Sequence, residues 1–170
     1  NLKIQDGCSF VCSFCIIPFA RGASRSRDLG NILDEARAKS DQGVRELVIS
    51  GVNIGTYRTE EVDLLHVLES LNAVKGIDRI RISSIEPTTI PTELFQWMND
   101  PQHALLPFFH IPLQAGSDKV LKEMRRRYST SEYLEFIHLA HESVDRLYLG
   151  TDIMCKIDTT IYIYIYIYIY

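Results

Sequence analysis

The chain has 170 residues, of which 46% are hydrophobic and 24% are charged, and its formal net charge is -4. This composition is typical of one soluble globular domain and excludes a disordered or fibrous chain. No apolar run approaches the roughly 18 residues that span a bilayer, and the first residues lack the basic and apolar regions of a signal peptide. We therefore expect a cytoplasmic protein with no membrane contact. The negative charge disfavours a uniformly basic nucleic-acid binder but allows local basic patches.

Short apolar runs alternate with amphipathic stretches between residues 2 and 154, which is typical of repeated strand–helix units around a parallel sheet. Turn residues bound five expected strands, at residues 2–5, 46–50, 79–83, 108–114 and 147–153. A first helix is expected from about residue 29 to 42, with Asp28 as its N-cap and Gly43 after its end. The other expected helices lie at residues 62–74, after Pro91, at 118–126 and at 131–143.

One face of several expected strands is polar, although buried parallel strands are normally apolar on both faces. Arginine and serine alternate with isoleucine in residues 79–83, and His110, Gln114 and Asp152 take similar positions in later strands. A complete eight-unit barrel fills its interior with branched apolar side chains. The polar face therefore predicts an α/β fold, a partial (β/α) TIM-like barrel with an open lumen for a polar ligand. A half-exposed mixed sheet is the alternative.

The last ten residues, 161–170, strictly alternate isoleucine and tyrosine. A repeated AT dinucleotide is translated into this alternation, so we expect residues 155–170 to be an aberrant tail from a frameshift or read-through. Residues 1–154 are then the functional core, with four strand–helix units, a fifth strand and an unpaired edge beside residues 147–153. A genuine strand is the competing interpretation, and an uncharged run of such high β-propensity would be prone to aggregation.

Three of the four cysteines, Cys8, Cys12 and Cys15, lie within eight residues on the loop after the first expected strand. This spacing favours metal binding in a reduced compartment over a disulfide framework. Three thiolates can hold three irons of a [4Fe–4S] cluster and leave the fourth iron open, whereas structural zinc and fully protein-ligated clusters take four ligands. Cys155 as a fourth ligand and a structural zinc site are the alternatives.

The Cys-x3-Cys-x-aromatic-Cys pattern resembles the signature of the radical S-adenosylmethionine (SAM) superfamily, and the residues around it, LKIQDGCSFVCSFCIIPFARGASRSR, resemble its methylthiotransferase family. The stretches VISGVNIGTY, RISSIEP, HIPLQAGSDKVLKEMRRRY and GTDIM are similar to that family in order and spacing. VNIGTY and MRRRY most resemble the branch that modifies threonylcarbamoyladenosine at position 37 of tRNA. The branches that act on isopentenyladenosine in tRNA or on an aspartate of a ribosomal protein are alternatives.

The resemblance implies a reaction in which SAM is reductively cleaved to a 5′-deoxyadenosyl radical, hydrogen is abstracted from C2 of the modified adenosine, and a methylthio group is inserted. It also implies an electron donor protein as a partner. The family has a preceding cluster domain and a following RNA-binding domain, so we expect this chain alone to assemble a cluster without modifying tRNA. An iron–sulfur electron-transfer module and an inactive gene fragment are the rival interpretations.

Residue roles carried over by the resemblance place the cluster on the three cysteines and SAM on its open iron. The expected SAM-binding residues follow successive strands: Phe14, Gly51, Val52, Asn53, Ser83, Glu86, Gln114 and Ser117. An ordinary turn role is the alternative for Gly51, and a capping or turn role is the alternative for Ser83 and Glu86.

Two groups of basic residues lie next to the expected active face of this net-acidic chain, which favours phosphate contacts with a tRNA anticodon arm. They are Arg21, Arg25 and Arg27, and Arg125, Arg126 and Arg127. A solvated charge run, or arginines that complement a helix C-terminus, is the alternative. His110 is expected to be a hydrogen-bonded strand residue, and His138 and His141 to lie on a solvated helix face because no third metal ligand is near.

Overall fold

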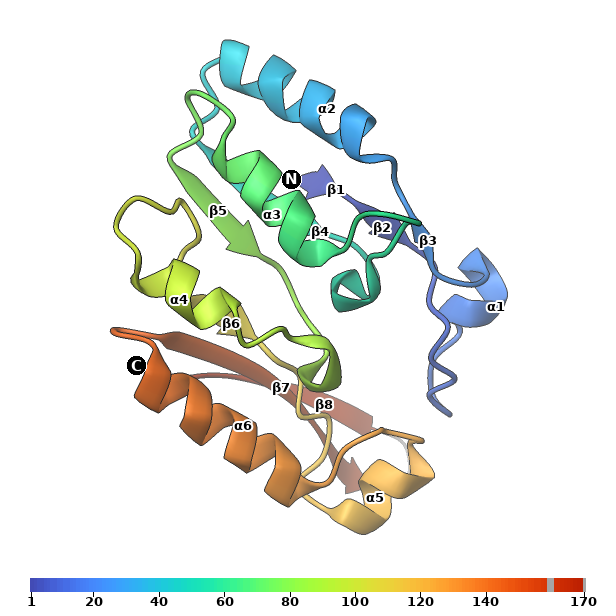
Figure 1. Cartoon of the computed structure of the whole chain (residues 1–170). Helices are drawn as coiled ribbons and strands as arrows, with labels where there is room; N and C mark the ends of the chain where they lie inside the picture. The colour runs from blue at the N-terminus through green and yellow to red at the C-terminus, as the bar shows by residue number, and fades with distance from the viewer. Residues whose placement is uncertain (159–160, 170) are drawn as a thin grey trace.

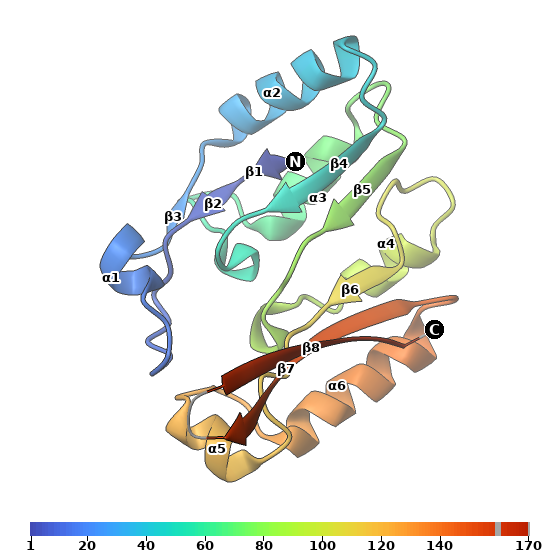
Figure 2. The same cartoon turned by 180° about the vertical axis from the view of Figure 1, so that it is seen from behind.

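The computed structural model describes residues 1–158 and 161–169, and the side chains of residues 1–154. Parallel pairing joins β1 (Leu2–Lys3), β4 (Glu46–Ser50) and β5 (Arg79–Ile82) in that order. A second sheet has the order β6 (Phe108–His110), β7 (Tyr148–Asp158) and β8 (Ile161–Ile169). Parallel bridges between Ile80 and Leu105 and between Ser84 and His110 connect the two sheets. Figures 1 and 2 show the strands side by side as one curved surface.

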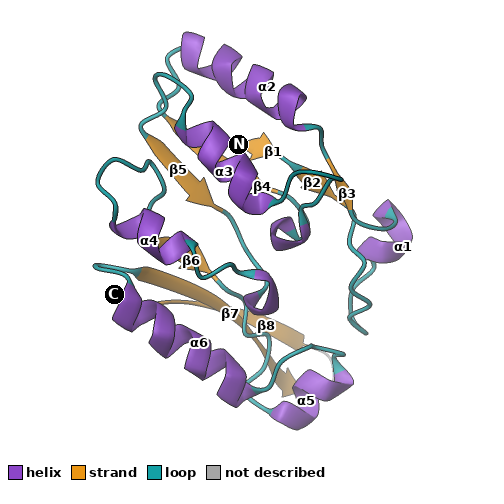
Figure 3. Ribbon diagram, viewed as in Figure 1, coloured by secondary structure: helices purple, strands orange, loops and turns teal. Residues whose placement is uncertain are grey.

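Helices α2 (Leu29–Asp41), α3 (Leu64–Asn72), α4 (Leu94–Asn99) and α6 (Thr130–Ser143) cover one face of this surface and leave the other open (Figure 3). The expected capping of α2 is confirmed, because the Asp28 carboxylate accepts a hydrogen bond from the Asn31 amide and Gly43 follows the helix at φ 87°. Among the described residues, no helix has the length and apolar character needed to cross a bilayer.

The core lies between the curved surface and the helices that cover it. Alternate residues of the strands point into it, among them Leu47 and Ile49 of β4 and Ile80 and Ile82 of β5, all at most 1% exposed. The helices contribute their apolar faces, whose buried residues are Ile32, Ala36, Leu64, Val67, Leu68, Leu71, Leu94, Phe95, Met98, Tyr133 and Ala140. Period-two burial in the strands therefore directs the intervening side chains to the open face.

The open face carries charged side chains, which confirms the polar lumen of a partial barrel. Arg79 and Arg81 of β5 both pair with Glu46 of β4 at 2.9 Å. Hydrogen bonding from Arg79, together with the charge of Arg81, holds the pKa of Glu46 below its ordinary value despite partial burial. Further along the face, His110 Nε2 lies 3.0 Å from a carboxylate oxygen of Asp152.

Two expected strands are shorter than the sequence pattern suggests. The strand expected at 108–114 ends at His110, because Pro112 has no N–H to donate and Gln114 has a positive φ of 70°. Gln114 rejoins β7 through an isolated bridge to Ile153. The strand expected at 2–5 divides into β1 and β2 (Gln5–Asp6), and β2 pairs antiparallel with β3 (Arg25–Ser26).

Three short helical turns were not expected and lie near the ends of the strands. They are α1 (Ile17–Arg21), η1 (Ile54–Thr56) and η2 (Pro87–Thr89). The helical segment expected at 118–126 is the shorter α5 (Asp118–Glu123), and the break expected around residues 128–130 separates it from α6.

The expected unpaired edge beside residues 147–153 is wrong, because β7 continues through residue 154 to Asp158 and pairs antiparallel with β8. Alternating isoleucine and tyrosine have high β-propensity, so this run forms a strand whatever its genetic origin. Thr159, Thr160 and Tyr170 lie outside the described residues. The domain boundary at residue 154 and the frameshift origin of the tail stay predictions.

Candidate functional site

A cavity of about 190 Å³ lies where the cysteine loop meets the segments that follow β4, β5 and β6. It brings together residues that are far apart in the sequence, as expected for a site at the carboxyl ends of parallel strands. The lining side chains are Cys8, Phe10, Cys12, Phe14, Cys15, Val52, Asn53, Ser84, Ile85, Glu86, Pro112, Gln114 and Arg126. All three cysteines are free and half-buried.

Three of the expected SAM-binding residues do not line this cavity. Gly51 lies behind it, where a Cβ atom would come within 2.6 Å of Ile54 and 2.9 Å of the Gln5 side chain, so glycine is needed there for close packing. The Ser83 amide is bonded to a β4 carbonyl, and its neighbour Ser84 lines the cavity in its place. Ser117 is exposed just before α5.

The base of the cysteine loop is fixed by a close backbone approach. Gly7 has a φ of 67°, and a Cβ atom there would lie 2.2 Å from the carbonyl oxygen of Ala23. The next residue, Cys8, donates its amide to the Gly22 carbonyl at 3.1 Å. Only glycine fits between the two chain segments with this backbone conformation, so Gly7 sets the direction in which the loop leaves β2.

The tip of the same loop is attached to the C-terminal end of α5. Ser13 donates its amide to the Met124 carbonyl at 3.1 Å and its hydroxyl to the Glu123 carbonyl at 2.8 Å. Within the loop, the Cys15 amide donates to the Cys12 carbonyl at 3.1 Å. The loop therefore spans the cavity from β2 to the end of α5, and its three thiols face residues of several strand ends.

Gln5 is a site residue that the sequence analysis missed. Its side chain is buried, with the whole residue 2% exposed, and its amide oxygen accepts hydrogen bonds from the amides of Val52 and Asn53, both at 2.9 Å. Its amide nitrogen donates to the Gly7 carbonyl at 2.7 Å and to the Ser24 hydroxyl at 2.8 Å. Gln5 thus ties the cysteine loop to the loop after β4. Its only sequence clue is its place between the first strand and Gly7.

Glu86 and Arg126 form a buried ion pair in the cavity wall. Arg126 Nη2 lies 2.6 Å from both carboxylate oxygens of Glu86. The Glu86 side chain is 13% exposed and the Arg126 side chain is 6% exposed. Burial raises the pKa of Glu86, while Arg126 and Arg127 act in the opposite direction. Burial also opposes the charge of Arg126, but the carboxylate of Glu86 and the nearby Tyr128 keep the pKa of the guanidinium above its ordinary value.

The structure separates the three consecutive arginines that were expected to form one phosphate-binding group. Arg126 lines the cavity, and its buried charge, which is paired with Glu86, does not favour the tRNA contact expected from the sequence. Arg125 is exposed at a φ of 57°, and Arg127 is exposed with its guanidinium 3.9 Å from the centre of the Phe10 ring. Only these two stay candidates for nucleic-acid contacts from this group.

The first arginine group is also divided. Arg21 and Arg25 lie with Lys3 around the single carboxylate of Asp6, at 3.2, 3.7 and 3.0 Å, which leaves an excess of positive charge. Bonding from Lys3, the Gly7 amide and Arg21 holds the pKa of Asp6 well below its usual range. Arg27 instead pairs with Glu35 and Asn31 of α2, so its charge serves the packing of that helix.

A hydrogen-bonded chain leads from the cavity along the open face. The Ser84 hydroxyl lies 2.7 Å from His110 Nδ1, and His110 Nε2 lies 3.0 Å from Asp152. The expectation that His110 is a hydrogen-bonded strand residue is confirmed. This series of hydrogen bonds could not be predicted from the sequence, because its three residues come from three different segments of the fold.

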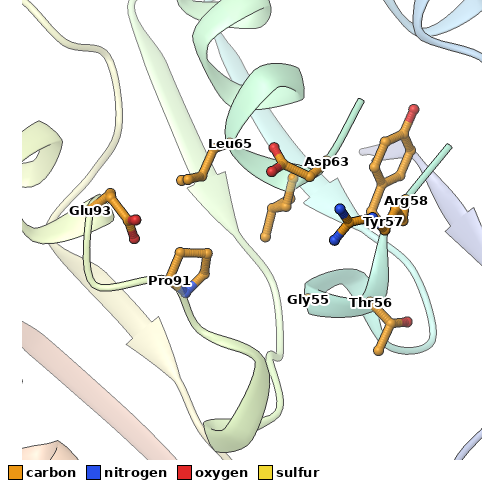
Figure 4. Close-up of a pocket in the computed structure, with 9 residues that line it drawn as sticks. Gly55, Thr56, Tyr57, Arg58, Asp63, Leu65, Pro91 and Glu93 are labelled. Carbon is orange, nitrogen blue, oxygen red and sulfur yellow. The ribbon is translucent and has the colours of Figure 1, made fainter. Parts of the chain in front are cut away.

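A second cavity of about 300 Å³ lies beside η1 and the start of α3. Figure 4 shows Pro91 and Glu93 on one side of it and Thr56 and Arg58 on the other, with Asp63 above. Cys8, Cys12 and Cys15 do not line this cavity, and neither does any of the expected SAM-binding residues. The three expected cluster ligands and five of the eight expected SAM-binding residues line the first cavity instead.

Comparison with known proteins decides the family. The model for the radical SAM superfamily matches residues 2–159. The chain belongs to the radical SAM superfamily. Members of this superfamily use a [4Fe–4S] cluster and SAM. The structure of the radical SAM methyltransferase TsrM from Kitasatospora setae covers 89% of this chain, and this chain covers 30% of TsrM, with a TM-score of 0.69 and 14% sequence identity. That likeness concerns the fold.

Similar curated proteins are tRNA methylthiotransferases. The threonylcarbamoyladenosine tRNA methylthiotransferase MtaB of Chlamydia pneumoniae is 41% identical over 153 residues, which cover 90% of this chain and 36% of the relative. The tRNA-2-methylthio-N(6)-dimethylallyladenosine synthase of Anaplasma phagocytophilum is 34% identical over 157 residues, which cover 90% of this chain and 35% of the relative. The chain therefore spans about a third of the length of the curated relatives it matches.

The groups that line the cavity of this radical SAM chain have the chemistry that the two cofactors of the superfamily need. Three free thiols on one loop, all of which line the cavity, can each take one iron. Asn53 is 6% exposed, and its Oδ1 atom has no hydrogen-bond partner within the described part of the chain. A buried acceptor without a partner, next to the thiols, suits the amino group or a hydroxyl of SAM.

Proposed function

We propose that this chain is the SAM-cleaving core of a methylthiotransferase that acts on a modified adenosine in tRNA. The observation that carries the proposal is the meeting of Cys8, Cys12 and Cys15 in one cavity with strand-end residues of the superfamily fold. The two relatives named above are both tRNA methylthiotransferases, and each match covers 90% of this chain. Their names support the reaction and the substrate class.

The chain's own residues would hold, orient and enclose the reactants. Cys8, Cys12 and Cys15 would hold a [4Fe–4S] cluster, which in its reduced form would supply the electron for cleavage of SAM. The side-chain oxygen Oδ1 of Asn53 is placed to accept a hydrogen bond from a donor group of SAM. The backbone amides of Val52 and Asn53 already donate to the Gln5 side chain, so they fix the loop and do not bind the ligand. Phe14 and Gln114 also line the cavity, where their side chains would restrict the access of water.

We propose threonylcarbamoyladenosine as the specific substrate. Of the two relatives named above, the threonylcarbamoyladenosine tRNA methylthiotransferase is 41% identical to this chain and the dimethylallyladenosine enzyme is 34% identical. A tRNA substrate further supports a cytoplasmic location. Reduction of the cluster requires an electron, and we propose that an electron donor protein supplies it. For the anticodon arm we propose contacts with the exposed residues Arg21, Arg25, Arg125 and Arg127.

The decisive experiment is anaerobic reconstitution of the chain with iron and sulfide, followed by incubation with SAM and a reductant. We expect about four irons per chain and SAM-dependent release of 5′-deoxyadenosine, measured by mass spectrometry. Alanine at each of Cys8, Cys12 and Cys15 should abolish both, whereas alanine at Cys155 should abolish neither. A cluster that forms without any 5′-deoxyadenosine would support the simple iron–sulfur module and contradict the proposal.

The tRNA contact is tested by charge reversal at Arg21 and Arg25. Neutralised phosphates set the slope of log affinity against log salt, so the double variant should bind tRNA more weakly and with a flatter slope. The matched control reverses Arg37, an exposed arginine of α2. If the parental chain and the double variant bind tRNA with equal affinity at every salt concentration, Arg21 and Arg25 belong to a solvated surface that does not contact tRNA.

A further inference from the structure

We infer that Arg126 sets the reduction potential of the cluster by donating a hydrogen bond to the Cys12 thiolate, while Glu86 limits how much of the arginine's charge the cluster experiences. The inference rests on the cluster assignment proposed above. The geometry behind it is the 3.4 Å separation between Arg126 Nη1 and Cys12 Sγ, in the same cavity as Cys8 and Cys15.

Arg126 is held rigidly in the orientation that this contact needs. Nη2 is taken by both oxygens of Glu86, and Nε donates to the Tyr128 hydroxyl at 3.2 Å, so Nη1 is left to face the sulfur. The guanidinium also lies 5.1 Å from the centre of the Tyr128 ring. A planar guanidinium fixed by two other partners has little freedom to leave Cys12.

Tyr128 is itself anchored, which extends the support to the sheet. Its hydroxyl donates to the carbonyls of Pro112 and Leu113, at 3.0 and 2.9 Å, in the segment after β6. Burial raises the pKa of Tyr128 to about 12, so the phenol stays neutral and keeps its proton for these bonds at neutral pH. Sheet, tyrosine, arginine and cysteine therefore form one continuous chain of contacts.

The expected electronic effect follows from charge. Reduction adds an electron to the cluster, and a buried positive charge or a hydrogen bond at a ligand sulfur stabilises the reduced form and raises the potential. The carboxylate of Glu86, 2.6 Å from Arg126, works against that charge at longer range. Removing the arginine should therefore lower the potential, and removing only the carboxylate charge should raise it.

The opposite signs make the inference testable on the reconstituted full chain without measuring turnover. Redox titration followed by electron paramagnetic resonance should give a more negative potential for Arg126→Gln and a less negative one for Glu86→Gln. The double variant should return towards the parental potential, and Arg126→Lys should stay closer to it than Arg126→Gln does. The controls Lys122→Gln and Glu123→Gln remove the same charges from exposed positions of α5 and should shift the potential by less.

Several outcomes would overturn the inference. One is a reduction potential of Arg126→Gln that equals the potential of Lys122→Gln. If SAM binding alone weakens in Arg126→Gln, the inference is also overturned, because Arg126 would then bind SAM instead of tuning the cluster. Another is a shift of the same sign in Arg126→Gln and Glu86→Gln, which would indicate general loosening of the site. If Arg126→Gln fails to retain iron, Arg126→Lys and Glu86→Gln decide the matter by the same criteria. A parental chain that binds no cluster refutes the cluster assignment itself.

Discussion

Replacement of Gln5 by leucine tests whether one buried amide joins the two loops that form the cavity. Leucine has a similar volume but no polar atoms, so it removes every hydrogen bond of the side chain without leaving a large void. The amides of Val52 and Asn53 and the carbonyl of Gly7 then lose the partner that each has at 2.7–2.9 Å.

The magnitude follows from those three groups. A buried polar group left without a partner costs about 1–3 kcal/mol, and water can reach the half-buried Val52 more easily than Asn53, which is 6% exposed. We therefore expect a loss of about 3–5 kcal/mol in the free energy of unfolding, a large part of the roughly 5–15 kcal/mol typical of a domain. With a urea dependence of about 2 kcal/mol per molar, the unfolding midpoint should fall by about 2 M.

The assay is urea unfolding followed by circular dichroism, together with hydrogen exchange at the amides of Val52 and Asn53. Exchange at both amides should accelerate more than exchange in the centre of β4, because the loop loses its anchor while the strand keeps its ladder. The matched control is Gln96→Leu, which changes an exposed glutamine of α4. If the midpoint of Gln5→Leu falls no further than that of the control, the cross-loop role assigned to Gln5 is refuted.

Three further predictions concern single residues of the site. Gly7→Ala, whose Cβ would meet the Ala23 carbonyl at 2.2 Å, should destabilise the chain by more than about 1 kcal/mol and reduce its iron content, and unchanged iron loading would contradict the role of the glycine. Gln114→Ala should weaken SAM binding about tenfold, the equivalent of one hydrogen bond of about 1.4 kcal/mol, with iron content unaltered. An unchanged SAM dissociation constant would remove Gln114 from the site. Because burial raises the pKa of Tyr128 from 10.0 to about 12, its contribution to stability should be complete below pH 10 and lost as the pH rises through 12. Urea unfolding of the parental chain and of Tyr128→Phe should then give midpoints that converge over that interval, and a constant difference would contradict the shift.

The features that depend on local patterns could be predicted from the amino-acid sequence alone. Three cysteines in eight residues can occupy one loop whatever the rest of the chain does, and Asp28 and Gly43 mark the ends of α2 because capping involves only neighbouring residues. Period-two alternation in residues 79–82 was enough to predict one buried and one polar strand face. The same patterns, together with the family resemblance, gave the partial barrel and the class of cofactors.

The contacts between side chains that are distant in the sequence became apparent in the three-dimensional structure. The arginines at 125, 126 and 127 are equivalent as a sequence run, yet a positive φ at Arg125 and the turn after α5 direct Arg126 alone towards Glu86, 40 positions earlier, and towards Cys12. Gln5 was missed for the same reason, because its partners at 52 and 53 are adjacent to it only after β1 and β4 have paired. Chain direction and long-range pairing, which no local pattern encodes, place these groups. For this reason the run of arginines at 125–127 was interpreted as a surface group, although the fold buries Arg126.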